Sequence, residues 1–267
     1  MNVISLGVGV QSSAIALMAM KGEIQPPPDL IVFSDPGWET KATYQYARWL
    51  KRTLETGGMK VIYTNNGNIK NDLLKAAKWG TRVASLPFFT LSKEGDTGIV
   101  MRQCTSEYKI NGVRKAIKQY RGFKTSRGFA DKEIKLWMGI STDEIQRVKP
   151  SQERWIENIY PLIDKGMSRM DCMSWLERNG YPVPPKSSCI GCPFHSDRTW
   201  LEMKRHDPES WKDAVEVDKA IRKMPKIKGQ VFLHRSCKPL DQVELNENQL
   251  EFDFDGFGNE CEGFCGV

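Results

Sequence analysis

The first twenty residues, MNVISLGVGVQSSAIALMAM (residues 1–20), decide the fold that this sequence predicts. A short apolar strand is expected over residues 3–6, and a turn that contains Gly7 and Gly9 follows it. Ser12 and Ser13 then open an apolar helix. A glycine turn lets backbone N–H groups approach an anion closely, and a helix N-terminus adds unpaired donors and the positive end of its dipole. This order therefore predicts a phosphate site at the carboxyl end of a parallel strand.

The same stretch also fits an ordinary buried turn between a strand and a helix, because a glycine turn alone is a weak signal. No GK[ST] follows the glycines, so the turn is not a Walker loop, and it lacks the spacing of the GxGxxG of dinucleotide-binding folds. In the phosphate-site interpretation, Ser12 or Ser13 caps the helix and offers a hydroxyl to the anion. Gln11 directly precedes them in the loop and is expected among the residues that bind the nucleotide.

Apolar strands and amphipathic helices alternate along the rest of the chain. This alternation predicts an α/β fold with a parallel twisted sheet and helices on both faces. We expect a nucleotide-binding domain over residues 1–165 and a small helical, cysteine-containing C-terminal subdomain over residues 166–267. The further expected strands are residues 29–35, 59–65 and 133–141, and the further expected helices are residues 42–57, 69–79, 105–122, 168–180, 197–203 and 208–224.

Composition and charge indicate the kind of partner and the cellular location of the protein. The 267 residues include 39 Lys and Arg against 33 Asp and Glu, and a net charge of +6 favours a polyanionic partner. The chain has no apolar run of the roughly 18 residues that a membrane span needs, and its start lacks the basic region of a signal peptide. We therefore expect a cytoplasmic protein with no membrane partner. The composition leaves the oligomeric state open.

The seven cysteines are an odd number, and in a reducing compartment they point to metal or sulfur chemistry instead of disulfides. Two of them form a CxxC motif in a loop bounded by glycine and proline, which lets two thiolates reach one centre. Cys172 falls at an apolar position of a helix and is expected in the core. The others are Cys104, Cys189, Cys192, Cys237, Cys261 and Cys265, of which Cys189 and Cys192 make the motif.

Polar residues follow the predicted strands at what should be one edge of the sheet. Asp35 stands where the second strand breaks at Pro36 and Gly37, a position suited to the ribose or adenine of a nucleotide, although Asp before Pro and Gly also simply forms turns. After the strand that ends near Gly139, Arg147 offers a fork for phosphate or sulfate. Asp143 and Glu144 beside it are potential Mg²⁺ ligands; the alternative is a solvated charged loop.

The order of these segments resembles the phosphoadenylyl-sulfate reductase-like branch of the PP-loop (adenine nucleotide alpha hydrolase-like) superfamily over residues 1–195. The resemblance rests on GVGVQSS, FSDPGWETKATY, MRQCTSEYK, GISTDEIQR, YPLIDKGMSRMDCMSWL and SSCIGCP in that order. It implies a nucleotide site in which Gly9 and Ser12 belong to the first loop, Asp35 and Gly37 to the second turn, and Gly139, Glu144 and Arg147 to the third. Outside that site, Pro161, Leu162, Asp171 and Trp175 match the family's entry into a later helix, which runs from a proline to a tryptophan.

The first loop departs from the family pattern SGGxDS at three positions. Gly7 stands for the first serine, Val8 for a glycine and Gln11 for the aspartate. Because Gln11 supplies no carboxylate, metal-assisted cleavage of a pyrophosphate bond must recruit Asp143, Glu144 or another acid, or else be lost.

The resemblance also implies a use for the cysteines. Iron-sulfur members of the family pair a cysteine like Cys104 with a later CxxC, here Cys189 and Cys192, to hold a [4Fe-4S] cluster. The fourth ligand is expected to be Cys261 or Cys265, with Cys237 as a further candidate. Zinc is the alternative metal, because a tetrahedral zinc site accepts the same cysteines, with His195 or a tail cysteine as the fourth ligand.

These expectations define one leading function and two alternatives. The leading one is an enzyme that binds ATP with Mg²⁺, cleaves it to AMP and pyrophosphate, and adenylates an acceptor for sulfur transfer, with a nucleic acid as acceptor and a sulfur-donor protein as partner. The first alternative is a sulfonucleotide reductase that uses a C-terminal cysteine. The second is a non-catalytic module that binds a nucleotide or a nucleic acid. The residues expected to act in catalysis are Cys261, Arg147 and Glu144.

Overall fold

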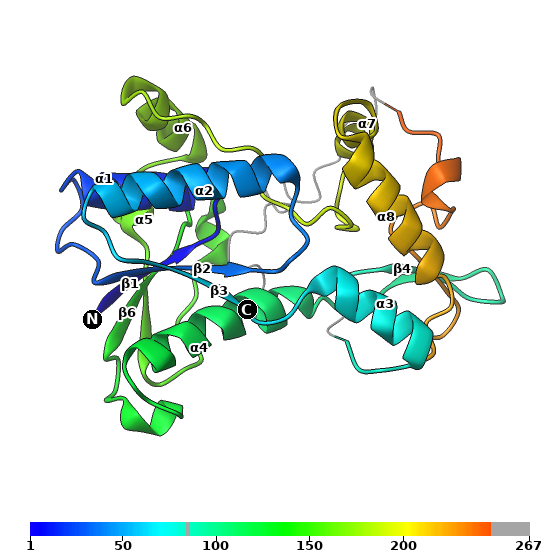
Figure 1. Ribbon diagram of the computed structural model, residues 1–267, viewed down its shortest axis with the longest axis horizontal. Helices are drawn as coiled ribbons and strands as arrows, with labels where there is room; N and C mark the ends of the chain where they lie inside the picture. The colour runs from blue at the N-terminus through cyan, green and yellow to red at the C-terminus, as the bar shows by residue number, and fades with distance from the viewer. Residues whose placement is uncertain (84–85, 247–267) are drawn as a thin grey trace.

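The computed structural model describes residues 1–83 and 86–246, which include a five-stranded sheet. The strand order is β3-β2-β1-β6-β7, and all neighbouring strands are parallel. Helices flank the sheet (Figure 1), so the predicted α/β fold is confirmed. The strands are β1 (Asn2–Leu6), β2 (Leu30–Asp35), β3 (Val61–Asn65), β6 (Ile134–Trp137) and β7 (Ile156–Ile159), of which β7 was not predicted.

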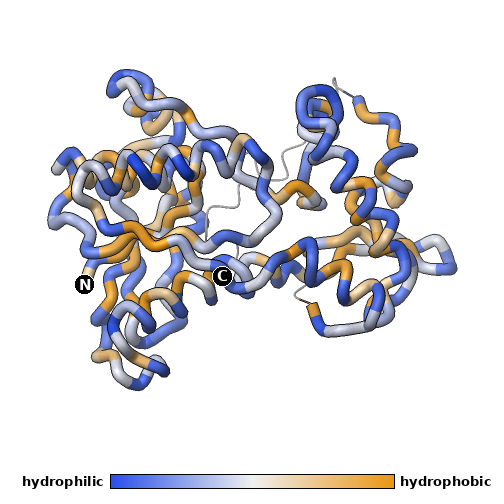
Figure 2. Tube along the Cα trace, viewed as in Figure 1, coloured by the Kyte–Doolittle hydropathy of each residue, from blue (hydrophilic) through white to orange (hydrophobic). Residues whose placement is uncertain are grey.

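Strands β1 and β2 are mostly apolar because helices cover both of their faces. Successive side chains of a strand point to opposite faces, so Val3 packs under one helical layer and Ile4 under the other. Figure 2 shows this hydrophobic band in the central strands. One face is covered by α1 (Val10–Met20), α2 (Lys41–Thr56), α5 (Pro161–Asp164) and α6 (Arg169–Arg178), and the other by α4 (Asn111–Tyr120).

A second core forms beside the sheet. It combines helices with a three-stranded antiparallel sheet of order β5-β4-β8, which was not predicted and of which only β8 falls within the predicted helical subdomain. The division of the chain at residue 165 stays a prediction, and each of the two cores draws on residues from both sides of it. The elements of the second core are α3 (Ile69–Trp79), β4 (Phe89–Leu91), β5 (Thr97–Ile99), α7 (Asp197–His206), α8 (Pro208–Ala220) and β8 (Gln230–Phe232).

Local signals explain where the helices begin. The side chain of Thr40 caps α2, that of Asn68 caps α3, and Ser168 and Asp171 form a capping box at α6. The single helix expected over residues 105–122 is instead a π-helix, η1 (Thr105–Ile110), that continues into α4. Three short 3₁₀ turns complete the described elements, namely η2 (Ser126–Gly128), η3 (Thr142–Arg147) and η4 (Leu240–Gln242).

Two further expectations can be compared with the described residues. Cys172 is fully buried in the first core, as predicted. Among the described residues, no helix has both the length and the hydropathy to cross a bilayer.

Gly112 lets α4 approach the sheet. A Cβ at this position would overlap the side chain of Ser34 on β2. The Ser34 hydroxyl donates a hydrogen bond to the carbonyl of Tyr108 at 2.6 Å, so it cannot move aside without losing that bond. The contact fixes η1 and α4 against the strand that ends at Asp35.

We expect Gly112→Ala to lower the free energy of unfolding by about 1–3 kcal/mol, because it overpacks a tight helix–strand contact. Chemical denaturation monitored by circular dichroism measures this change. In a Ser34→Gly background the overlap is absent, and the same substitution should be neutral or stabilising, since alanine favours the helix over glycine. Equal destabilisation in both backgrounds would show that Ser34 is not the obstacle.

Candidate functional site

The strand order places a topological switch point between β1 and β6. From β1 the chain adds β2 and β3 on one side, and then returns to add β6 and β7 on the other. Open α/β sheets bind ligands in the crevice outside the carboxyl ends of the strands at such a point. The turn with Gly7 and Gly9 follows β1, and the segment with Gly139 and Ser141 follows β6. The predicted convergence of these loops at one sheet edge agrees with the parallel register.

The first turn is closed by its own side chains. Ser12 Oγ accepts a hydrogen bond from the Gly7 N–H at 3.2 Å and donates to the Gly9 carbonyl at 3.4 Å. The Gly7 carbonyl accepts a bond from Ser187 Oγ at 2.9 Å. Gly7, Gly9, Ser12 and Ser13 are all buried, and the N-cap residue of α1, Gly9, provides no side-chain cap. To bind an anion, this turn would have to give up the hydrogen bonds of Ser12 Oγ within the turn. The Ser12 hydroxyl and the N–H groups of the first turn of α1 would then donate to the anion.

Val8 adds backbone strain to the same turn. Its φ is +64°, in the left-handed region that β-branched residues rarely adopt, and its side chain is fully buried. Such a conformation costs on the order of 1–3 kcal/mol and persists only where the surroundings enforce it. This is the position at which the resembling family has a glycine.

Gln11 connects three elements at the switch point. Its side chain is 1% exposed. Its Nε2 donates to Glu144 Oε2 at 3.2 Å and to Ser141 Oγ at 3.3 Å, and its Oε1 accepts a bond from Arg169 Nη1 at 3.0 Å. Gln11, at the position where the resembling family has an aspartate, thus links α1, η3 and α6.

Two arginines meet at this Gln11–Glu144 pair. Glu144 is 2% exposed and its Oε1 accepts a hydrogen bond from Arg147. The carboxylate of Asp143 accepts the backbone N–H of Arg169 at 3.1 and 3.2 Å, which fixes the start of α6 beside η3. Guanidinium groups bind phosphate and sulfate oxygens bidentately, so the pair of arginines suits an oxyanion at the crevice.

Sequence reasoning found Arg147 but missed Arg169. The only signal for Arg169 was its place directly after the Ser168 cap, which says nothing about the direction of its side chain. Asp143 and Glu144 were expected as Mg²⁺ ligands. In the structure both carboxylates accept hydrogen bonds from protein groups, so a role in holding Mg²⁺ stays a prediction.

Asp35 shapes the turn that follows β2. Its Oδ1 accepts hydrogen bonds from the Gly37 N–H at 2.7 Å and from the Tyr44 hydroxyl at 2.9 Å. Gly37 has a φ of +76°, and a Cβ there would overlap Asn68. The contacts are those of a turn-forming aspartate, and they place its carboxylate at the sheet edge, on the strand next to β1.

The CxxC motif packs against Trp38 and Glu39, which follow the Asp35 turn. Glu39 and Cys189 form an isolated antiparallel bridge, and the Ile190 N–H donates to the Trp38 carbonyl at 2.8 Å. Gly191 lies against the indole of Trp38 so closely that a Cβ would overlap the ring. Trp38 and Glu39 therefore seat the turn of Cys189 and Cys192 next to the Asp35 turn.

Cys104 is anchored to the same segment. It lies directly before η1 and shares an apolar cluster with Trp38 and Cys189. On η1, Lys109 Nζ forms a buried ion pair with Glu39 Oε1 at 3.3 Å. A buried ion pair fixes geometry because losing one partner leaves an uncompensated charge. The structure thus brings both predicted cysteine segments to Trp38 and Glu39.

The described residues do not complete a metal site. Within residues 1–83 and 86–246, no three His, Cys, Asp or Glu side chains form a group that could hold a metal ion. Cys237 Sγ lies 3.7 Å from the Thr90 carbonyl, at the antiparallel sheet. Cys261 and Cys265 lie outside the described residues, so the predicted set of ligands is untested.

His195 is held by the CxxC turn. Its Nε2 lies 3.0 Å from the Cys189 carbonyl, and burial, with the nearby Lys186, lowers its pKa to about 4. The imidazole is therefore neutral at pH 7. Because Nε2 is engaged by the backbone, we assign His195 a role in supporting the turn.

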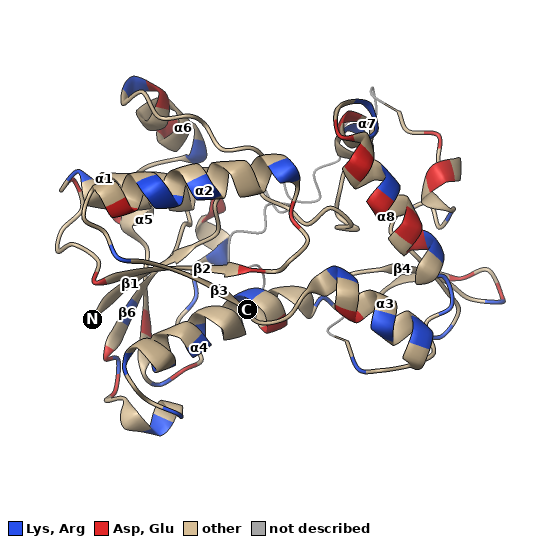
Figure 3. Cartoon of the chain, in the orientation of Figure 1, with Lys and Arg blue, Asp and Glu red and all other residues tan. Residues whose placement is uncertain are grey.

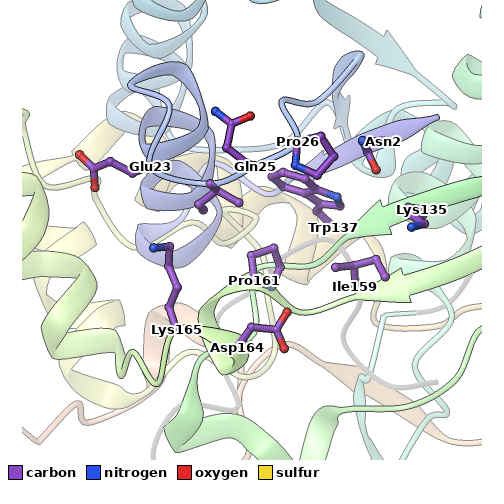
Figure 4. A pocket seen from close by; sticks show the side chains of 11 residues that line it. Asn2, Glu23, Gln25, Pro26, Lys135, Trp137, Ile159, Pro161, Asp164 and Lys165 are labelled. Atoms are coloured by element: carbon purple, nitrogen blue, oxygen red, sulfur yellow. The ribbon is translucent and has the colours of Figure 1, made fainter.

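A separate cavity of about 300 Å³ lies on the α1 side of the sheet, near the chain segment after α1 (Figure 4). Trp137 and Lys135 of β6 line it together with Pro161. None of the residues predicted for the nucleotide site does so.

No protein-family model and no curated protein matches the chain. Among solved structures, the chain is similar to the U34-tRNA thiolase NcsA from Methanococcus maripaludis with its [4Fe-4S] cluster. The match has 13% sequence identity and a TM-score of 0.40, and it covers 90% of this chain and 78% of that chain. A likeness of this size defines neither a family nor a function for the chain.

Gly191→Ala should displace the CxxC turn, because the added Cβ overlaps the Trp38 ring. We expect faster alkylation of Cys189, which is buried, and a loss of about 1–3 kcal/mol of stability from overpacking. Iodoacetamide labelling followed by peptide mass spectrometry measures the rate at each cysteine. Gly98→Ala, at an exposed strand position, is the control. An unchanged alkylation rate at Cys189 would show that the contact of Gly191 with Trp38 does not hold the CxxC turn in place.

Proposed function

We propose that the chain is an enzyme of the PP-loop superfamily, of the phosphoadenylyl-sulfate reductase-like kind. In this proposal it binds ATP at the turn of Gly7 and Gly9 and cleaves it to AMP and pyrophosphate to adenylate an acceptor for sulfur transfer. The acceptor is a nucleic acid. The observation that carries the proposal is the meeting of Arg147 and Arg169 at the buried Gln11–Glu144 pair, at the switch point of a parallel sheet.

The phosphates would lie between the first turn and these arginines. The N-terminus of α1 has no acidic residue in its first turn, so its dipole and amide groups favour a negative charge. An acceptor oxygen attacks the α-phosphorus, the bond to the β-phosphate oxygen breaks, and pyrophosphate leaves. Arg147 and Arg169 would stabilise the charge that develops on the leaving group. A sulfur nucleophile then displaces AMP from the activated acceptor.

Gln11 has a positioning role in this scheme. With an amide in place of a carboxylate, it donates to Glu144 and accepts from Arg169, so it holds both a buried acid and a cation at the crevice. Mg²⁺ that accompanies the phosphates would take a protein ligand from Asp143 or Glu144. Either acid would then exchange one of its present hydrogen bonds.

The cysteines would supply the sulfur chemistry. Cys104, Cys189 and Cys192, with Cys261 or Cys265, would hold a [4Fe-4S] cluster, with zinc as the alternative metal. The support from the described residues is the common seat of Cys104 and Cys189 on the segment after Asp35. A cluster contributes redox or sulfur-transfer chemistry when bound. A sulfur-donor protein would restore the sulfur after each turnover.

The reaction products test the proposal. Protein purified without oxygen is incubated with α-labelled ATP and an RNA pool, and AMP and pyrophosphate are quantified. Their release supports the proposed reaction. Sulfite formed from phosphoadenylyl sulfate would instead identify a sulfonucleotide reductase that uses a C-terminal cysteine, and binding without turnover would identify a non-catalytic module.

Arg147→Ala and Arg169→Ala should each weaken ATP binding about 10- to 100-fold, because a hydrogen bond to a charged group contributes roughly 1.5–3 kcal/mol. Isothermal titration calorimetry measures the dissociation constant. The matched control is Arg121→Ala, which removes another arginine paired with a glutamate, Glu133, just before β6 at the amino edge of the sheet. Unchanged affinity in both test variants would place the phosphates elsewhere.

A further inference from the structure

A second cavity, of about 460 Å³, lies between α2 and the beginning of α8, next to the CxxC turn. Its volume is in the range of small-molecule sites. Ile190, between the two cysteines of the motif, lines it, and so does Tyr44, whose hydroxyl is bonded to Asp35. The cavity therefore touches both halves of the candidate site.

Cations extend from this cavity along α2. Lys41, Gln45, Arg48 and Arg52 are exposed and recur at the spacing of one helix face. Lys41 and Arg48 line the cavity itself. The rise of an α-helix puts these two residues about 10 Å apart along the axis and Arg52 about 6 Å further. Figure 3 shows the basic positions along α2.

This cationic stripe, defined as Lys41, Arg48 and Arg52, has no acidic partners within the described part of the chain. None of the three forms an ion pair there, and the acid on the same helix, Glu55, pairs with Lys51. An unpaired row of exposed cations on one helix is the electrostatic pattern of a surface that follows a phosphate backbone.

The lining of the cavity also includes three acids, and two of them are compensated. Glu39 pairs with Lys109, while Asp213 pairs with Lys70 and accepts a bond from Trp38 Nε1 at 2.7 Å. Glu209 is the remaining acid of the lining. The negative charge of Glu209 would repel an anion bound in the cavity. Removing this charge should therefore strengthen the binding of an anion, whereas removing a cation should weaken it.

Tyr44 provides an aromatic surface in the cavity. Its hydroxyl donates to Asp35 Oδ1 at 2.9 Å and accepts from the Glu39 N–H at 3.3 Å, so the ring is held in place. Proteins that bind single strands combine a basic groove with aromatic rings on which bases stack. A single nucleotide could occupy the cavity while its neighbours follow the stripe.

We propose that a single-stranded nucleic acid binds along the cationic stripe with one nucleotide in the cavity between α2 and α8. The proposal rests on the proposed function, because it names where the acceptor lies. It presents that nucleotide to the edge of the sheet at Asp35 and to the turn of Cys189 and Cys192. Duplexes fit this arrangement poorly, since their bases are paired and stacked.

The test measures binding of fluorescein-labelled oligouridylate, oligothymidylate and a DNA duplex by fluorescence anisotropy over a series of KCl concentrations. The variant Lys41→Ala/Arg48→Ala should bind both single strands more weakly. Its slope of log K against log salt should be smaller in magnitude by about 1.4, the change for two lost phosphate contacts on a single strand. Glu209→Gln should bind about two- to fivefold more tightly, because it removes one repulsive charge.

The control variant is Lys115→Ala/Lys118→Ala, which removes two positive charges from α4 on the other face of the sheet and should keep the wild-type slope. The comparison of oligouridylate with oligothymidylate distinguishes an RNA from a DNA acceptor. Circular dichroism checks that each variant is folded.

Three results would overturn the proposal: no binding of either single strand, tighter binding of the duplex, or an equal loss of slope in the α2 and α4 variants. ATP calorimetry on the same proteins separates this inference from the proposed function. If ATP binds normally while the oligonucleotide results fail, only the assigned surface is wrong. If ATP also fails to bind, the proposed function fails with it.

Discussion

The hydrogen bond from Gln11 to Glu144 is the interaction on which the candidate site depends. It crosses the switch point from the first turn of α1 to η3, and Glu144 is almost completely buried. A buried carboxylate is stable only with partners, and Glu144 obtains them from Gln11 and Arg147. Since Gln11 also accepts a bond from Arg169, its amide contacts that arginine directly and is connected to Arg147 through Glu144. An ionised aspartate at this position could not donate a hydrogen bond to Glu144. Compared with an aspartate, Gln11 therefore both lacks a negative charge and adds a hydrogen bond to the buried carboxylate.

A second constraint joins the Asp35 turn to the segments that carry the cysteines. The segment of Trp38 and Glu39 leaves the Asp35 turn and pairs directly with Cys189 and Ile190. The buried pair of Glu39 and Lys109 then fixes the helix that follows Cys104. The Asp35 turn, the CxxC turn and the helix after Cys104 are therefore all tied to one short segment, Trp38 and Glu39.

Much of this fold could be predicted because it depends on local patterns. The apolar runs of β1, β2 and β6 and the capping residues Thr40, Asn68 and Ser168 mark their elements directly in the sequence. The short strands β4, β5 and β8 were missed because each has three residues and is stabilised by pairing with distant segments. Arg169 was missed for the same kind of reason, since its contact with Gln11 spans 158 positions. Cys261 and Cys265 lie outside the described residues, so their roles stay predictions.

Nuclear magnetic resonance of protein labelled with ¹⁵N-glycine tests the central claim most directly, because it observes the backbone amides of the first turn during an ATP titration. If the phosphates bind at the switch point, the resonances of Gly7, Gly9 and Gly139 should shift together and saturate with one affinity. Those of Gly122, after α4, and Gly180, after α6, should stay unchanged. Saturable ATP binding that shifts other glycines and leaves Gly7 and Gly9 unaffected would contradict the account.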